Sequence, residues 1–147
     1  KYRPKYPVYS SQTTNEGIMG YLDNYDFEGE YVTWTTDGAN AGTVFYRKGK
    51  FNCTNVCGTL KVQNKYNPHF IALSLGLVAK KHVFSNLANP KLMNNVMANI
   101  KISIPKLEIQ DEISKLFQSI ESKIDLEDSL LIAYQKMKEY LLSNIFI

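Results

Sequence analysis

The chain has 147 residues, of which 44% are hydrophobic and 21% are charged, and its formal net charge is +3. This composition is ordinary for a folded soluble protein and leaves room for one medium domain plus a further element. No run of about eighteen apolar residues occurs, so we expect no membrane span. With only Cys53 and Cys57 as cysteines and no recognisable signal peptide, we expect buried thiols and a reducing cytoplasm. A start at Lys1 rather than methionine suggests a piece excised from something longer.

The charge is unevenly distributed along the chain. Residues 1–105 hold twelve Lys and Arg against six Asp and Glu, whereas residues 106–147 hold five against eight. A basic first part followed by an acidic second part indicates that the first part meets a polyanion and the second meets protein.

Short strands and turns are predicted for the first third of the chain. Residues 8–10 suggest a short strand, and residues 17–21 suggest a turn that leads into another. Residues 23–29 have the composition of a loop. Residues 31–35 alternate and are rich in aromatic and β-branched side chains, which predicts a strand.

The next segments continue this pattern. Residues 37–42 predict a glycine-bounded turn, and residues 43–46 predict a returning strand. Residues 47–50 have the composition of a basic turn. Residues 53–62 predict further short strands, which Gly58 interrupts.

Helical signals then replace the strand pattern. Asn67 and Pro68 predict a helix cap followed by proline at the first helical position, with helical spacing as far as Lys80 and Lys81. Residues 90–97 predict a second, shorter helix. Residues 99–104 alternate strictly and predict a strand whose isoleucines face inward.

A long amphipathic helix is predicted from Glu108 to Ile145, after a border at Pro105. At about 1.5 Å per residue it would be roughly 57 Å long. Its seam positions alternate in steps of four and three, and two of the ten hold Glu127 and Lys138. The other eight are apolar and are our predicted helix-pairing residues: Ile113, Phe117, Ile120, Ile124, Leu131, Tyr134, Leu141 and Ile145. The alternative is a helix folded back on its own domain.

The predicted fold is therefore α+β. Residues 1–105 form a compact domain of short strands and small helices, and residues 106–147 form a long C-terminal coiled-coil helix.

Catalytic and metal-binding patterns are weak. Asp26, Glu28 and Glu30 alternate and would face one way, as in a metal-dependent nuclease, but a solvated acidic loop and strand edge explains them better. The two cysteines lack histidines at a spacing suited to zinc. We therefore predict no catalytic residue, no metal and no cofactor.

Polar and basic side chains in the predicted loops favour a DNA-binding surface. Hydroxyl and amide groups suit base edges, and cationic groups suit phosphates. The predicted DNA-binding residues are Ser10, Ser11, Thr13, Thr35, Thr36, Asn40, Arg47, Lys48, Lys80, Lys81, Asn86 and Lys91. Taken singly, each of them is an ordinary loop residue.

Five segments carry a family resemblance. They are residues 6–11, 15–21, 37–44, 100–110 and 140–146. The most specific is the junction at 100–110, where an isoleucine-rich strand and a proline precede Leu-x-x-Gln at the start of the helix. In their order and spacing, these segments resemble one half of the specificity subunit of type I restriction-modification systems, a target recognition domain followed by one spacer helix.

The resemblance implies a function without chemistry in this chain. A complete family subunit has two recognition domains, each reading half of a bipartite DNA site, and two spacer helices that pair antiparallel and dock the methyltransferase subunits. The expected partners are double-stranded DNA, methyltransferase subunits and restriction subunits. With one domain and one helix, the chain is either an excised half, whose partner is a second domain and helix, or a half-length subunit that forms a homodimer.

Two other functions remain open. The main alternative is a protein-interaction module that assembles through its helix without binding DNA. The weaker alternative is the nuclease based on the three acidic residues. If DNA is the ligand, Lys48, Lys80, Lys81 and Lys91 should converge on one concave face.

Overall fold

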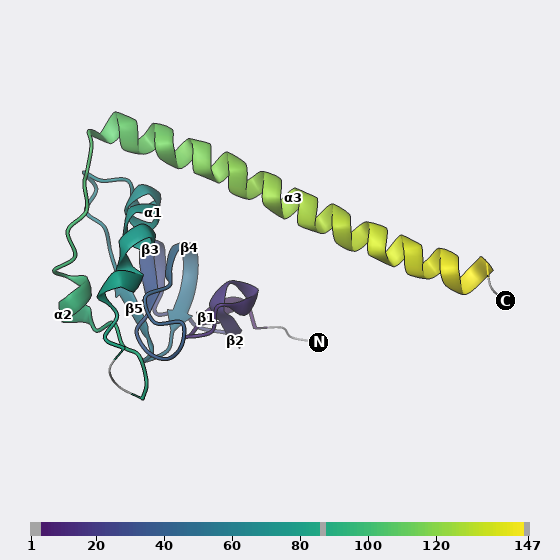
Figure 1. The fold of residues 1–147 in the computed structure, drawn as a ribbon, viewed down its shortest axis with the longest axis horizontal. Helices are drawn as coiled ribbons and strands as arrows, with labels where there is room; N and C mark the ends of the chain where they lie inside the picture. The colour runs from purple at the N-terminus through teal and green to yellow at the C-terminus, as the bar shows by residue number, and fades with distance from the viewer. Residues whose placement is uncertain (1–3, 86–87, 146–147) are drawn as a thin grey trace. The chain divides into compact units, whose positions relative to one another are not determined.

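A computed structural model describes residues 4–85 and 88–145 (Figure 1). The chain divides into two compact units, Lys1–Gln110 and Asp111–Ile147. The first unit contains a sheet and small helices, and one long helix ends the described chain. The predicted α+β fold with a long C-terminal helix is confirmed.

The first unit is built on a five-stranded sheet with the order β2-β1-β4-β3-β5. Only β1 and β4 are parallel, and the other neighbours are antiparallel. The strands are β1 (Tyr6–Tyr9), β2 (Ile18–Leu22), β3 (Phe27–Thr35), β4 (Val44–Cys53) and β5 (Cys57–Leu60). The predicted strands near residues 8–10, 17–21, 31–35 and 43–46 are therefore all present.

The long β3–β4 pair corrects two loop predictions. Residues 47–50 are not a turn but the middle of β4, and β3 begins within the predicted loop at residues 23–29. Glu28 lies opposite Lys50, and Glu30 lies opposite Lys48. Their ion pairs measure 3.6 and 3.4 Å. These charged residues alternate along an exposed face of the sheet. The polar composition that suggested loops therefore reflects ion pairs between the two strands.

Gly58 does not interrupt a strand as predicted, because it lies inside β5. A Cβ atom at this position would lie 2.2 Å from Cε2 of Trp34. The buried indole of Trp34 also donates a hydrogen bond from Nε1 to the Leu92 carbonyl oxygen at 3.1 Å. The glycine therefore provides the space in which Trp34 packs flat against the neighbouring strand.

Gly58→Ala is expected to lower the free energy of unfolding by about 1–3 kcal/mol, as overpacking of a core does. The matched control is Gly20→Ala in β2, where an added Cβ would meet no atom within 4 Å. That control is expected to change stability by less than about 0.5 kcal/mol. Urea unfolding followed by circular dichroism measures both, and equal stability of the two variants would contradict the packing described here.

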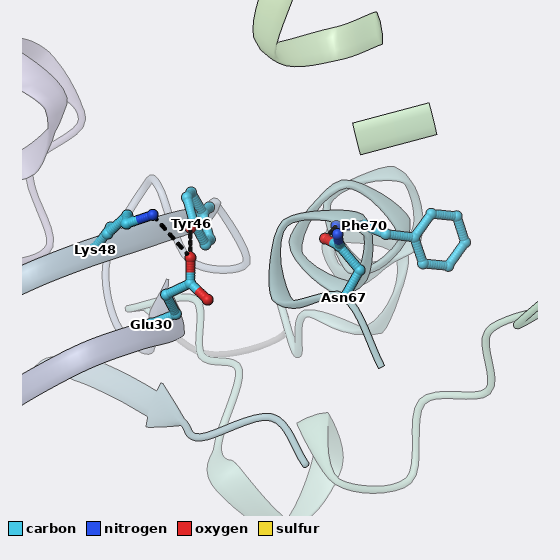
Figure 2. A network of polar contacts seen from close by, with 5 residues as sticks. All are labelled: Glu30, Tyr46, Lys48, Asn67 and Phe70. Carbon is cyan, nitrogen blue, oxygen red and sulfur yellow. Dashed lines mark hydrogen bonds and ion pairs between the residues drawn. The ribbon is translucent and has the colours of Figure 1, made fainter. Parts of the chain in front are cut away.

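Helix α1 (Pro68–Val78) covers the sheet at β4 and β3. Its predicted cap is confirmed, because the Phe70 backbone N–H donates to Oδ1 of Asn67 at 3.0 Å (Figure 2). The helix buries Phe70, Ile71 and Leu75. The predicted helical spacing as far as Lys80 and Lys81 continues as a 3-10 turn, η2 (Ala79–His82).

The segment before the long helix differs from its prediction. Helix α2 (Asn94–Met97) is much shorter than residues 90–97. Residues 99–104 join no strand, so that prediction is wrong. Ile100, Ile102 and Ile104 instead line one wall of a mostly apolar groove of about 520 Å³ that also includes Trp34. The isoleucines alternate with polar residues because only one side of this segment contacts the groove.

The junction that enters the long helix is held by Gln110, which is 2% exposed. Its side-chain Nε2 donates to the Pro105 carbonyl oxygen at 2.8 Å, and its Oε1 accepts from the Asn67 backbone N–H at 3.0 Å. The glutamine of the Leu-x-x-Gln junction therefore ties the start of the helix to the loop that caps α1.

Helix α3 (Leu107–Ile145) has 39 residues, so its prediction is confirmed. At about 1.5 Å per residue it is roughly 57 Å long. No helix among the described residues is both long and apolar enough to cross a membrane.

Candidate nucleic-acid interface

The turn at residues 37–42 is fixed to a distant segment of the chain by Asp37. Its Oδ2 lies 3.4 Å from Nζ of Lys91, and its Oδ1 accepts a hydrogen bond from the side-chain amide of Asn89. The Gly38 backbone N–H donates to the Pro90 carbonyl oxygen at 3.0 Å. Residues 37–42 and 89–91 therefore lie side by side.

Gly42 brings a third segment against the same turn. Its φ is +80°, and a Cβ atom there would lie 2.9 Å from Cγ2 of Val83 and 3.3 Å from the backbone nitrogen of Lys80. Only glycine combines this conformation with so close an approach. The 3-10 turn η2, with exposed Lys80 and Lys81, is therefore seated on the turn at residues 37–42.

These three segments form what we call the basic cluster, consisting of Asn40, Lys80, Lys81 and Lys91. Asn40, Lys80 and Lys81 are exposed, whereas Lys91 is partly neutralised by Asp37. Among residues 4–85 and 88–145, no acidic side chain forms an ion pair with Lys80 or Lys81. Their positive charges are thus available to an anionic partner.

The loop that contains Ser10, Ser11 and Thr13 forms a second polar region. All three residues are half-buried, and the loop continues into the 3-10 turn η1 (Thr14–Gly17). Asn15 and Glu16 adopt positive φ values of 49° and 53°. Such a backbone conformation is costly for residues other than glycine and requires support from its surroundings.

Arg47, which was predicted to contact phosphate, supplies that support. It is only 5% exposed and donates a hydrogen bond to the Glu16 carbonyl oxygen. Its guanidinium carbon lies 3.7 Å from the ring centroid of Tyr9 and 4.2 Å from that of Phe45. Burial lowers the pKa of Arg47 and raises that of Tyr9. The arginine holds the turn at residues 14–17 from inside the fold.

Thr35 and Thr36, two other predicted DNA contacts, are buried. They are 1% and 9% exposed. The backbone N–H of Thr36 donates to the Val56 carbonyl oxygen, and its own carbonyl oxygen accepts from the backbone N–H of Leu92. Thr35 ends β3 and Thr36 follows it, and both residues are packed inside the fold.

Lys48 lies on β4 and forms an ion pair with Glu30 (Figure 2). Its Nζ is 3.4 Å from Oε1 of Glu30, which also accepts a hydrogen bond from the hydroxyl of Tyr46. That hydrogen bond lowers the pKa of Glu30, whereas burial and the same bond raise the pKa of Tyr46. The Tyr46 ring contacts His69 at the start of α1, whereas Lys80 follows the end of that helix. The segments of Lys80, Lys81 and Lys91 thus meet at the turn of residues 37–42, whereas Lys48 lies on β4, and the convergence of the four lysines on one concave face stays a prediction.

Two of the three acidic residues of the nuclease alternative form ion pairs, and the third is held through its backbone. Glu28 and Glu30 pair with lysines of β4, and the backbone N–H of Asp26 donates to Oδ1 of Asn52 at 3.0 Å. The described part of the chain contains no group of three acidic, histidine or cysteine side chains placed to hold a metal ion. Asn86, another predicted contact, lies outside the described residues.

The predicted helix-pairing residues all lie on α3. Ile113 is half-buried, and the other seven are exposed, with Phe117 at 41% and Ile145 at 66%. Their pairing role stays a prediction, since it requires a second helix.

Sequence reasoning missed the residues that assemble the basic cluster, Asp37 and Gly42. The Asp-Gly pair at residues 37 and 38 predicted a turn, but nothing local indicated which distant segments would pack against it.

Comparison with known proteins gives the class to which this fold belongs. The family model described as "Type I restriction modification DNA specificity domain" matches residues 1–133. The chain therefore belongs to the family of type I restriction-modification DNA specificity domains. A crystal structure of the type I restriction-modification S subunit from M. genitalium matches with a TM-score of 0.76 at 19% sequence identity, over 99% of this chain and 39% of that one. That likeness supports the fold.

Relatives in Mycoplasma pneumoniae share more of the sequence. A putative type I specificity subunit is 46% identical over 147 residues, covering 95% of this chain and 39% of the relative. The specificity subunit of the type I restriction enzyme MpnII is 44% identical over 141 residues, covering 88% of this chain and 42% of the relative. The chain thus spans about two fifths of the length of these relatives.

Proposed function

We propose that this chain recognises DNA as one half of a type I specificity subunit. In this proposal, residues 1–105 are the target recognition domain that reads one half of a bipartite site. Residues 106–147 are the spacer helix. The chain itself performs no chemistry, and partner methyltransferase and restriction subunits in the cytoplasm methylate and cut the DNA.

The observation that carries the proposal is the basic cluster. It joins three segments that are distant in sequence, and Lys80 and Lys81 have no acidic partner among the described residues. Cationic side chains on phosphates fix the register of a protein on DNA, while neighbouring amides and hydroxyls read base edges. Asn40 lies in the same cluster, and Ser10, Ser11 and Thr13 supply a second polar loop.

The exposed seam of α3 supports the spacer role. A row of apolar side chains along a helix of about 57 Å is a surface that pairs with another helix rather than remaining in water. That length is sufficient to hold two recognition domains at least one turn of DNA, about 34–36 Å, apart. Pairing of two copies of this chain would give a twofold reader, which suits a palindromic bipartite site.

No observation favours the alternative of a pure protein-interaction module. The family to which this chain belongs is described as a DNA specificity domain. A surface that served only solubility would not require the assembly of three distant segments around Asp37.

The proposal predicts DNA binding that weakens steeply with salt, because lysines on phosphates displace condensed counterions. A log–log plot of affinity against salt concentration should be linear, with a slope of about −0.9 for each phosphate contacted. Fluorescence anisotropy with double-stranded DNA over a range of sodium chloride concentrations measures it. An affinity independent of salt would contradict the proposal.

A further inference from the structure

Cys53 and Cys57 meet across the connection between two strands. Cys53 ends β4 and Cys57 begins β5, and their Sγ atoms lie 3.3 Å apart. The Cys57 backbone N–H donates to the Thr54 carbonyl oxygen at 3.1 Å, which fixes the turn between them. Both residues are free thiols of intermediate exposure.

The surroundings make the two thiols unequal. When Cys57 ionises, the Cys53 thiol donates a hydrogen bond to its sulfur, and Arg47 adds a nearby positive charge, so the pKa of Cys57 is lowered. The same hydrogen bond, together with burial, raises the pKa of Cys53. Cys57 is therefore the sulfur of the pair that ionises more readily. A thiolate is the form that reacts with oxidants.

We propose that Cys53 and Cys57 are a redox-active dithiol that a hydroperoxide converts into an intramolecular disulfide. The sulfurs need to approach from 3.3 Å to a bonding distance of about 2 Å. The proposal does not rest on DNA recognition. Arg47 connects it to the turn at residues 14–17 through the Glu16 carbonyl oxygen.

The chemistry has two steps. The Cys57 thiolate attacks one peroxide oxygen, the O–O bond breaks, and the leaving oxygen takes up a proton, which gives a sulfenic acid. The Cys53 sulfur then attacks the sulfur of Cys57, forming the S–S bond and breaking the S–O bond, while the proton of Cys53 leaves with the hydroxide as water. Two thiols and one hydrogen peroxide thus give one disulfide and two waters.

The test uses the reduced full chain, freed of reductant and exposed to one equivalent of hydrogen peroxide in native buffer. The samples are then blocked with an alkylating agent and weighed by intact mass spectrometry. We expect a monomeric product that has lost two hydrogen atoms and carries no alkyl group. It should form about tenfold faster in native buffer than in denaturant, because unfolding removes both the lowered pKa of Cys57 and the close approach of the two sulfurs.

The two single variants separate the roles of the sulfurs. Cys53→Ser should stop at a sulfenic acid on Cys57 that dimedone traps, and Cys57→Ser should react roughly tenfold more slowly. Two alkyl groups on the peroxide-treated wild-type chain, a disulfide between chains, or equal rates in native buffer and denaturant would each overturn the proposal. The comparison of native and denatured wild-type chain decides the question even if a serine variant fails to fold.

Discussion

Leu131→Asp is expected to abolish pairing of the long helix and to leave the globular unit folded. Leu131 lies on the exposed apolar seam of α3. Burying one leucine contributes about 1.5–3 kcal/mol, and a dimer of this chain would lose that contribution twice. A loss of roughly 3–6 kcal/mol weakens association by about a hundredfold to ten-thousandfold. A carboxylate forced into the seam adds a desolvation cost.

Light scattering at several protein concentrations measures this effect. The matched control is Leu126→Asp, because Leu126 is exposed on the same helix but lies off the seam. We expect the wild-type chain and the control to be dimers and Leu131→Asp to be a monomer with an unchanged globular unit by circular dichroism. The same molecular mass for all three proteins would contradict pairing through this seam.

Replacing Lys80 and Lys81 together with alanine is expected to weaken DNA binding about a hundredfold, roughly tenfold for each lost phosphate contact. Both lysines are exposed in η2 and have no acidic partner among the described residues. Since phosphate contacts carry no sequence information, the loss should be similar for every DNA sequence. The slope of the salt dependence should fall by about two.

The control for this pair is Lys65→Ala combined with Lys101→Ala. These lysines are also exposed but lie outside the basic cluster, so the net charge changes equally. Anisotropy titrations at one salt concentration should show little change for the control. If both double variants lose affinity equally, binding depends on overall charge and not on the cluster.

Local signals in the sequence predicted the elements whose ends are set by nearby residues. The Asn67 side chain and Pro68 fixed the start of α1, because a cap and its helix are adjacent in the chain. The four-and-three spacing predicted α3 almost to the residue, since the helical period is a property of the helix itself.

Errors arose where distant residues decide the structure. Lys48 and Lys50 resembled turn residues because their partners, Glu30 and Glu28, lie about twenty positions earlier in the chain. Arg47 resembled a surface cation, but Tyr9 and Phe45 flank its guanidinium inside the fold. Strand register and burial depend on such long-range pairings, which a local pattern does not specify.

The sequence predicted the types of residue in the candidate site, but it did not predict which of them share a surface. Lysines, hydroxyls and amides in loops indicated an anionic ligand, and Lys80 and Lys81 remain exposed. Which of these residues share a surface follows from the packing of η2 and residues 89–91 on the turn that contains Asp37 and Gly42.

Selection of bound duplexes from a random DNA pool, followed by sequencing, tests the central claim most directly. The full chain is incubated with the pool at moderate salt, where nonspecific binding is weak, and the retained duplexes are sequenced. We predict enrichment of one short motif, which is repeated as a palindrome at a fixed spacing when the chain pairs with itself. Retained DNA with no enriched motif would contradict target recognition by this domain.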